Sequence, residues 1–352
     1  MNPYLRKNVQ AIKPYTVDSS EYEVMLHANE NPFNPFRDLK QEIMQALFEC
    51  NGNRYPSIDA APLRAALAES TGFSQNQILC GNGSDEILQM IVQAFIDPED
   101  TIISFAPTFS MYQFFAEVQG ANFISVDADP NTLQVSLKDL ADKANESKAK
   151  LIILCNPNNP TGQGFSKEEI MTLIEETDAL VLVDEAYMEF YGESVLDQVK
   201  ECPRMIVTRT FSKAYGLAGI RVGYAVADPS LIAALDLVRA PYNLNAASQT
   251  IAMVALKNKQ LFEKQISLLL SERDRMEETL SGLSGVTLFP TKANFILIRS
   301  EKAANIESAC VDSSIQIRGY KSEGLLKNCI RISIGKPEEN DKLLEIIREV
   351  QA

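Results

Sequence analysis

The chain has 352 residues, of which 45% are hydrophobic and 23% charged, as in globular proteins with room for two cores. Its net charge of −14 argues against nucleic acid or an anionic membrane as a partner, because both need a basic surface. No apolar run reaches the length of a membrane span and the N-terminus is polar, so we expect a cytoplasmic protein.

The composition argues against a metal site and against a zinc or redox pair of cysteines. His27 is the only histidine, and the six cysteines are scattered without a C-x-x-C pair. We therefore expect no metal site and no Ser-His-Asp triad. Cys80 and Cys155 end apolar runs and are expected to be buried free thiols.

The pattern of elements divides the chain into three parts. Residues 1–30 are polar and irregular, and we expect an arm that packs on the rest of the protein. Between residues 31 and 245, strands and helices alternate, which predicts an α/β domain with a mostly parallel sheet. Ligands bind beyond the carboxyl ends of the strands in such sheets. The expected strands are 78–80, 101–105, 123–126, 151–155, 180–184, 205–208 and 222–226, and the expected helices include 39–50, 62–69, 85–95, 108–118 and 136–144.

Longer helices characterise the C-terminal part of the chain, at 260–283 and 338–350. They accompany three expected strands, at 294–298, 315–318 and 329–334. We expect a smaller α+β domain over residues 246–352.

Lys213 lies in a loop between two expected strands, among small and hydroxyl-bearing residues. A lysine held near a cation loses its proton more readily, and the neutral amine attacks carbonyl carbons. A solvated surface lysine is the alternative. A Schiff-base role needs a phosphate site and a partner for an aromatic nitrogen elsewhere in the chain.

A phosphate site is offered by the segment Gly-Asn-Gly-Ser-Asp-Glu at 81–86, between a strand and a helix. Glycines let the backbone approach an anion, and the helix N-terminus supplies free N–H groups. A capped turn before a helix explains the same sequence equally well. Arg221, eight residues beyond Lys213, could return to the cleft and hold a phosphate with two hydrogen bonds.

Asp184 ends an apolar strand, where a carboxylate needs a cation or a proton donor. A protonated pyridine nitrogen is one such partner, and a helix N-cap role is the alternative. Tyr187 follows three residues later and can aim a hydroxyl into the same cleft. Asn159 lies in a loop with two prolines that fixes the direction of its side-chain amides.

Taken in order, these motifs resemble those of the fold-type I aminotransferases, which use pyridoxal 5'-phosphate. They are Asn-Pro-Asn-Asn-Pro-Thr-Gly at 156–162, Asp-x-x-Tyr at 184–187, Thr-x-Ser-Lys at 210–213, and Arg221. The resemblance covers almost the whole chain and implies a large domain with a mostly parallel seven-stranded sheet and a small α+β domain. Finer features at 7–15, 28–32, 53–56, 107–109 and 331–335 resemble the histidinol-phosphate aminotransferases.

The resemblance also implies a role for each site residue. Lys213 would bind the cofactor aldehyde and then move the substrate proton, while Asp184 would pair with the ring nitrogen. Tyr187 and Asn159 would hydrogen-bond the ring oxygen, and Phe109 would stack on the ring where the family more often has tyrosine. The cofactor phosphate would be held by Gly83, Ser84, Asp85, Thr210, Ser212, Arg221 and, from the neighbouring subunit, Tyr55.

For the substrates, the resemblance implies transamination of L-histidinol phosphate with 2-oxoglutarate by a homodimer with shared active sites. Arg331 matches the residue that holds the substrate anion. Arg318 suits the same anions but could instead form a surface ion pair, and Tyr15 and Asn31 are expected to close the pocket. Three alternatives stay open: an aromatic or broad-range aminotransferase, a threonine-phosphate decarboxylase, and a non-catalytic cofactor-binding regulator.

Overall fold

The structure is a computed structural model that describes residues 4–12, 20–320 and 324–352. Its centre is a seven-stranded sheet, as the resemblance implied, and the strand order is β2-β8-β7-β6-β5-β3-β4. All neighbouring strands are parallel except at β8, which runs antiparallel to both β2 and β7. The strands are β2 (Ile78–Asn82), β3 (Thr101–Ala106), β4 (Asn122–Asp127), β5 (Leu151–Cys155), β6 (Leu180–Asp184), β7 (Met205–Thr210) and β8 (Val222–Ala227).

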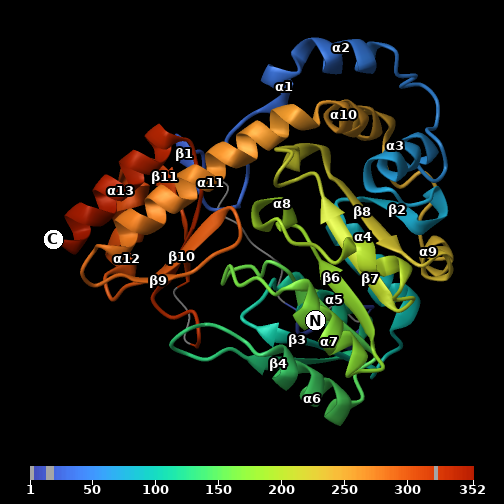
Figure 1. The fold of residues 1–352 in the computed structure, drawn as a ribbon, viewed down its shortest axis with the longest axis horizontal. Helices are drawn as coiled ribbons and strands as arrows, with labels where there is room; N and C mark the ends of the chain where they lie inside the picture. The colour runs from blue at the N-terminus through green and yellow to red at the C-terminus, as the bar shows by residue number, and fades with distance from the viewer. Residues whose placement is uncertain (1–3, 13–19, 321–323) are drawn as a thin grey trace.

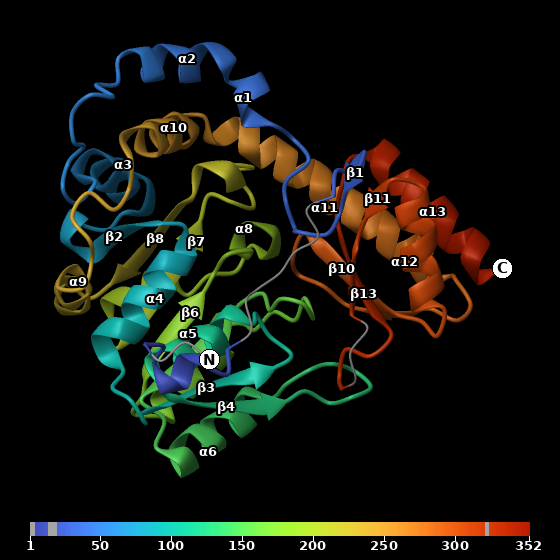
Figure 2. The same cartoon turned by 180° about the vertical axis from the view of Figure 1, so that it is seen from behind.

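Both faces of this sheet are covered by helices (Figures 1 and 2). Alternate residues of one strand enter different cores: Val181 and Val183 pack on one face, and Leu182 packs on the other. This double burial explains why the central strands are apolar throughout. The helices of this part are α1 (Pro35–Asp38), α2 (Lys40–Phe48), α3 (Ala61–Thr71), α4 (Ser84–Phe95), α5 (Met111–Gln119), α6 (Leu137–Ser147), α7 (Lys167–Glu175), α8 (Met188–Tyr191), α9 (Pro229–Asp236) and α10 (Ala246–Lys257).

Local capping sets several of these helix ends. Ser166 and Glu169 form a capping box at the start of α7. The helix expected at 108–118 begins later, at Met111, because Thr108 lies in a bend and its side chain instead hydrogen-bonds Asn158. The prediction of the helix start was wrong by three residues.

The C-terminal part has its own sheet, in the order β12-β13-β10-β9, which is antiparallel throughout. Its long helix α11 runs from α10 beside the large sheet to the far end of the small one (Figure 1). The elements are α11 (Lys259–Ser281), β9 (Thr287–Phe289), β10 (Phe295–Arg299), α12 (Ala303–Asp312), β11 (Ile315–Gln316), β12 (Arg318–Tyr320), β13 (Cys329–Ser333) and α13 (Pro337–Gln351).

The strand expected at 315–318 is divided in the structure. β11 pairs in parallel with β1 (Val24–Met25) of the N-terminal segment, whereas β12 pairs with β13. The chain changes partners at Ile317, so one expected strand serves two sheets. The N-terminal segment thus forms a separate two-stranded sheet with β11. Nearer the N-terminus, the Asn8 side chain donates to the Glu117 and Val118 carbonyls at the end of α5.

Two further findings concern the described residues as a whole. Among them no helix is both long enough and apolar enough to cross a membrane. The same residues contain no group of three metal-ligating side chains placed to hold an ion. The domain limits expected at residues 30 and 245 stay predictions.

Candidate active site

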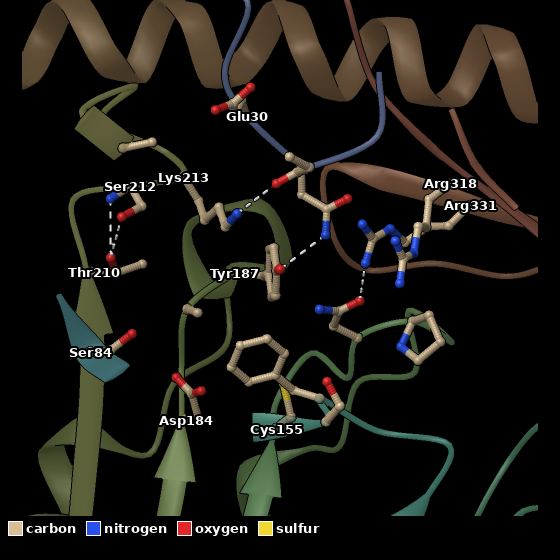
Figure 3. A pocket seen from close by; sticks show the side chains of 18 of the residues that line it. Glu30, Ser84, Cys155, Asp184, Tyr187, Thr210, Ser212, Lys213, Arg318 and Arg331 are labelled. Carbon is tan, nitrogen blue, oxygen red and sulfur yellow. Dashed lines mark hydrogen bonds between the residues drawn. The ribbon is translucent and has the colours of Figure 1, made fainter. Parts of the chain in front are cut away.

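A cavity of about 530 Å³ opens beyond the carboxyl ends of β5, β6 and β7. Figure 3 shows Ser84, Thr210 and Ser212 on one side of it and Arg318 and Arg331 on the opposite side. Lys213, Asp184 and Tyr187 lie between these two groups (Figure 3). The sheet topology therefore brings together residues that are more than 200 positions apart in the chain, from Ser84 to Arg331.

Lys213 reaches into this cavity from the loop after β7. Its Nζ donates a hydrogen bond of 2.8 Å to the Ala28 carbonyl and lies 5.8 Å from the centre of the Tyr187 ring. Desolvation by the surrounding protein, with repulsion from Arg331 second, lowers the pKa of Lys213 to about 8. The amine is thus poised to act as a nucleophile or a base near neutral pH.

Asp184 lies at the floor of the cavity at the end of β6, and only 4% of its surface is exposed. Its Oδ2 accepts a hydrogen bond of 2.8 Å from the Tyr112 hydroxyl, and its Oδ1 accepts one of 3.1 Å from Thr208. Burial raises the pKa of Asp184 to about 6 although both donors oppose the rise. This buried carboxylate would gain most from a cationic partner in the cavity.

Two asparagines and a tyrosine line the wall between Asp184 and the arginines. The Tyr187 hydroxyl accepts a hydrogen bond of 3.0 Å from the Asn29 side chain, and burial raises its pKa. The Asn159 side-chain oxygen accepts from the Arg331 guanidinium. The neighbouring Asn158 donates to the Pro107 carbonyl at 2.9 Å and so ties the loops after β5 and β3 together.

The opposite end of the cavity has the features of an anion site. Ser84 begins α4, and Gly83 before it has a φ of +81° that favours glycine. The Arg221 guanidinium reaches Asp85 at 3.1 Å and Ser212 at 3.5 Å. The hydroxyls of Thr210 and Ser212 are 3.0 Å apart.

Close packing of the backbone shapes this anion site. A Cβ on Gly223 would lie 2.4 Å from the Ser84 backbone nitrogen, so β8 and the start of α4 approach as only glycine permits. Free helix N–H groups, two hydroxyls and a guanidinium suit a phosphate. With an amine at Lys213 and a buried carboxylate at Asp184, the residues present fit pyridoxal phosphate.

Two arginines face each other at the other end of the cavity. Arg318 of β12 and Arg331 of β13 are directly opposite in the antiparallel register, so their side chains lie on the same face of the sheet. Arg331 is 8% exposed and also donates to the His27 carbonyl. Arg318 lies against the Tyr320 ring, 5.9 Å from its centre. Both arginines line the cavity.

The remaining expected residues fall in different places. Phe109 lines the cavity, and its ring meets the edge of Tyr112 at 5.5 Å. Tyr55 does not line it: this side chain is 83% exposed and stacks on Tyr242. Asn31 does not line it either, because its amide donates to the Ala214 carbonyl at 3.0 Å beside Lys213. Tyr15 lies outside the described residues.

Sequence reasoning missed several residues that the fold brings to the cavity. Asn29 and Glu30 of the N-terminal segment line it, as do Tyr320 of β12 and Leu326 of the turn before β13. Tyr112 was missed as the donor to Asp184. The one signal in the sequence was the motif Asn29-Glu30-Asn31-Pro32, which carried the resemblance but was not assigned a contact with Tyr187.

Comparison with known proteins places this fold and site in one class. The family model for aminotransferase class I and II matches residues 23–347. The chain belongs to the class I and II aminotransferases, enzymes that depend on pyridoxal phosphate.

Among its relatives are histidinol-phosphate aminotransferases. The one from Clostridium novyi (strain NT) is 36% identical over 97% of this chain and 96% of its own length. The one from Caldanaerobacter subterraneus subsp. tengcongensis is 36% identical over 98% of each.

Solved structures agree on the fold. The histidinol-phosphate aminotransferase of Sinorhizobium meliloti, in complex with pyridoxal-5'-phosphate, has a TM-score of 0.89 and 25% identity over 99% of this chain and 97% of that one. The L-threonine-O-3-phosphate decarboxylase of Porphyromonas gingivalis matches with a TM-score of 0.80 and 24% identity, over 93% of this chain and 98% of that one. The second likeness shows the fold alone.

Proposed function

We propose that this protein transaminates L-histidinol phosphate with 2-oxoglutarate, giving imidazole acetol phosphate and glutamate in histidine biosynthesis. The observation that carries the proposal is the pair of arginines, Arg318 and Arg331, facing each other at one end of the Lys213 cavity. One substrate brings a phosphate and the other a dicarboxylate, and two adjacent guanidiniums can bind either anion. The relatives that are 36% identical carry the same named activity.

Bound pyridoxal phosphate would supply an aldehyde for the substrate amine and a ring that accepts electrons from the broken Cα–H bond. Ser84, Thr210, Ser212 and Arg221 would hold its phosphate. Asp184 would face the ring nitrogen, and its negative charge would keep a proton there. Phe109 would pack on the ring, with Tyr187 and Asn159 at the ring oxygen.

Lys213 moves the proton in this proposal. Its lowered pKa would let the neutral amine take the proton from the substrate Cα near neutral pH, and the protonated amine would then serve as the acid for the bound cofactor. The Ala28 carbonyl accepts a hydrogen bond from its Nζ and holds the side chain in the cavity between the arginines and Asp184. Arg331 would anchor the far end of the substrate, so that the Cα hydrogen is presented to the lysine.

The assembly proposed is a homodimer with shared active sites. Its support is a surface on the large domain where Tyr55, Ile58 and Tyr242 are all exposed apolar or aromatic side chains. Tyr55 would reach the cofactor phosphate of the other subunit. A cytoplasmic location is proposed as well. All six cysteines are unpaired, and free thiols are typical of proteins in the reducing cytoplasm.

The first test is a single-turnover experiment on the protein loaded with cofactor. L-histidinol phosphate, phenylalanine and threonine phosphate are added separately, and the absorption of the bound cofactor is followed. Rapid conversion to the pyridoxamine form by histidinol phosphate alone supports the proposal. Equal conversion by phenylalanine would indicate a broad aromatic aminotransferase, and carbon dioxide release from threonine phosphate would indicate a decarboxylase.

A second test addresses the arginine that is proposed to bind both anions. Arg331→Ala should raise the KM for histidinol phosphate and for 2-oxoglutarate, each by about tenfold or more, because a charged hydrogen bond is lost. Steady-state kinetics of both half-reactions measure this. A rise for one substrate only, or for neither, would contradict the shared role of Arg331.

A further inference from the structure

The floor of the cavity contains a buried hydrogen-bonded group that the proposed mechanism has not used. Tyr112 of α5 is 1% exposed, and its hydroxyl donates to Asp184 Oδ2 at 2.8 Å. Thr208, fully buried on β7, is the register partner of Asp184 and donates to Oδ1 at 3.1 Å. Each carboxylate oxygen therefore has one side-chain donor from a neighbouring element, and the Ala186 backbone N–H also donates to the carboxylate.

The direction of the Tyr112 hydrogen bond follows from its surroundings. Burial, and next the Asp184 charge, raise the pKa of Tyr112, so the phenol keeps its proton and donates it. The Cys155 thiol lies beside the same hydroxyl and donates to the Pro157 carbonyl at 3.3 Å. Figure 3 shows Cys155 and Asp184 near the ends of neighbouring strands.

Tyr112 also touches the residue proposed to stack on the cofactor. Its ring and that of Phe109 meet edge to face, with centres 5.5 Å apart and planes at 85°. One side chain thus fixes both the carboxylate below the cavity and the aromatic ring that lines it.

We propose that Tyr112 is a positioning residue that keeps Asp184 ionised and oriented toward the cofactor ring nitrogen, with Thr208 as the second support. The inference rests on the cofactor site proposed above. An ionised carboxylate stabilises a protonated ring nitrogen, whereas a protonated carboxyl group does not. Both donors favour the charged form of Asp184, against the effect of burial.

One other charge near Asp184 opposes its ionisation. The Asp85 charge raises the pKa of Asp184, and the buried Cys155 thiol, with a pKa raised to about 12, is neutral near pH 7. The titratable and charged groups around Asp184 are Tyr112 of α5, Cys155 of β5, Asp85 of α4, Tyr187 of the following turn, and Lys213 and Arg221 across the cavity. Tyr112→Phe changes only one of these groups and removes no charge.

The test compares two cofactors in the full-length protein. Pyridoxal phosphate carries the ring nitrogen, and 1-deazapyridoxal phosphate replaces it with carbon. Tyr112→Phe should weaken binding of pyridoxal phosphate about tenfold, since a hydrogen bond to a charged group is lost, and leave the deaza cofactor within about twofold. The pH below which pyridoxal phosphate affinity falls should rise by about one unit in this variant, because the pKa of Asp184 rises.

Matched variants separate this role from a packing role. Thr208→Val should show the same selective loss, and Tyr191→Phe, which removes a phenol hydroxyl outside the cavity, should leave both affinities unchanged. Asp184→Asn should lower the affinity for pyridoxal phosphate more than that for the deaza cofactor. If it does so, but Tyr112→Phe lowers both affinities equally or lowers neither, the inference is overturned. If the unaltered protein binds both cofactors equally, the proposed cofactor site falls and this inference with it.

Discussion

At the scale of single residues, the proton on Lys213 governs when the site becomes reactive. Its pKa in the folded chain is lowered from 10.5 to about 8, so the neutral amine dominates above that pH. We expect the rate of pyridoxal phosphate uptake by the cofactor-free protein to rise with pH and to level off above about pH 8. Absorption of the bound cofactor, with borohydride trapping of the lysine linkage, measures the rate at each pH.

The control for this experiment is Lys213→Arg, which keeps a cation but should give no trapped product because arginine stays protonated. An uptake rate that continued to rise through pH 10 would mean that the lysine is not perturbed.

The sequence predicted residues whose role depends on their own type and neighbours. Lys213, Asp184 and Arg221 could be named because a loop lysine, a carboxylate ending a buried strand and a returning arginine each carry chemistry by themselves. Tyr112 could not, since its contact with Asp184 joins positions 72 apart and a tyrosine on a helix is usually core. Asn31 was expected in the pocket, yet its amide satisfies the backbone beside Lys213.

At the scale of elements, the close contact between β8 and α4 controls the phosphate end of the cavity. In Gly223→Ala the new Cβ would meet the Ser84 nitrogen at 2.4 Å and the Gly83 carbonyl carbon at 2.6 Å. Both atoms are backbone, so the start of α4 must shift. We expect pyridoxal phosphate affinity to fall about tenfold or more and stability by about 1–3 kcal/mol.

Equilibrium dialysis and urea unfolding measure these two effects. Gly52→Ala, at a position where the added Cβ meets nothing within 4 Å, is the matched control. Unchanged cofactor affinity in Gly223→Ala would show that the spacing between β8 and α4 does not shape the phosphate site.

A buried ion pair joins Glu185, the residue after β6, to Arg209 of β7. The Glu185 carboxylate is fully buried and accepts from the Arg209 guanidinium at 2.8 and 2.9 Å. Arg209→Met would leave this carboxylate without its cation, so the free energy of unfolding should fall by about 3–5 kcal/mol. The double variant Glu185→Gln with Arg209→Met should recover part of that loss.

Urea unfolding of the cofactor-loaded protein checks the ion-pair prediction. The control is Lys138→Met, which breaks an exposed pair with Asp142 and should cost less than about 1 kcal/mol. Equal losses for Arg209→Met and Lys138→Met would refute the prediction.

The predicted and observed elements agree most closely for strands that are buried on both faces. β5 and β6 were predicted at the residues where the structure has them, because a short, wholly apolar run in an alternating α/β pattern indicates a buried strand. The segment 315–318 was misread since pairing partners cannot be read from one strand: half pairs with the N-terminal segment and half with β13. The start of α5 depended on a side chain in a loop that lies 50 residues away.

At the scale of the whole molecule, the proposed shared site can be tested by mixing inactive variants. Tyr55→Ala and Lys213→Ala alter residues that would lie in the same site but on different subunits. In a mixed dimer one site carries both defects and the other none, so random exchange should restore roughly a quarter of full activity.

The matched control is a mixture of Lys213→Ala with Arg331→Ala, whose residues belong to one cavity of one chain. Each site of that mixed dimer keeps one defect, and activity should not return. Equal activity in the two mixtures would contradict the sharing of sites, and sedimentation of each protein checks that dimers form.

One contact described above makes the active site observable by itself. Arg331 donates to the backbone carbonyl of His27. His27 lines the cavity and is the single histidine of the chain. Histidine labelled with ¹³C only at Cε1 would therefore give one imidazole resonance, without competing signals from elsewhere in the chain. When an anion reaches Arg331, that resonance should shift, so the protein carries its own reporter of substrate arrival.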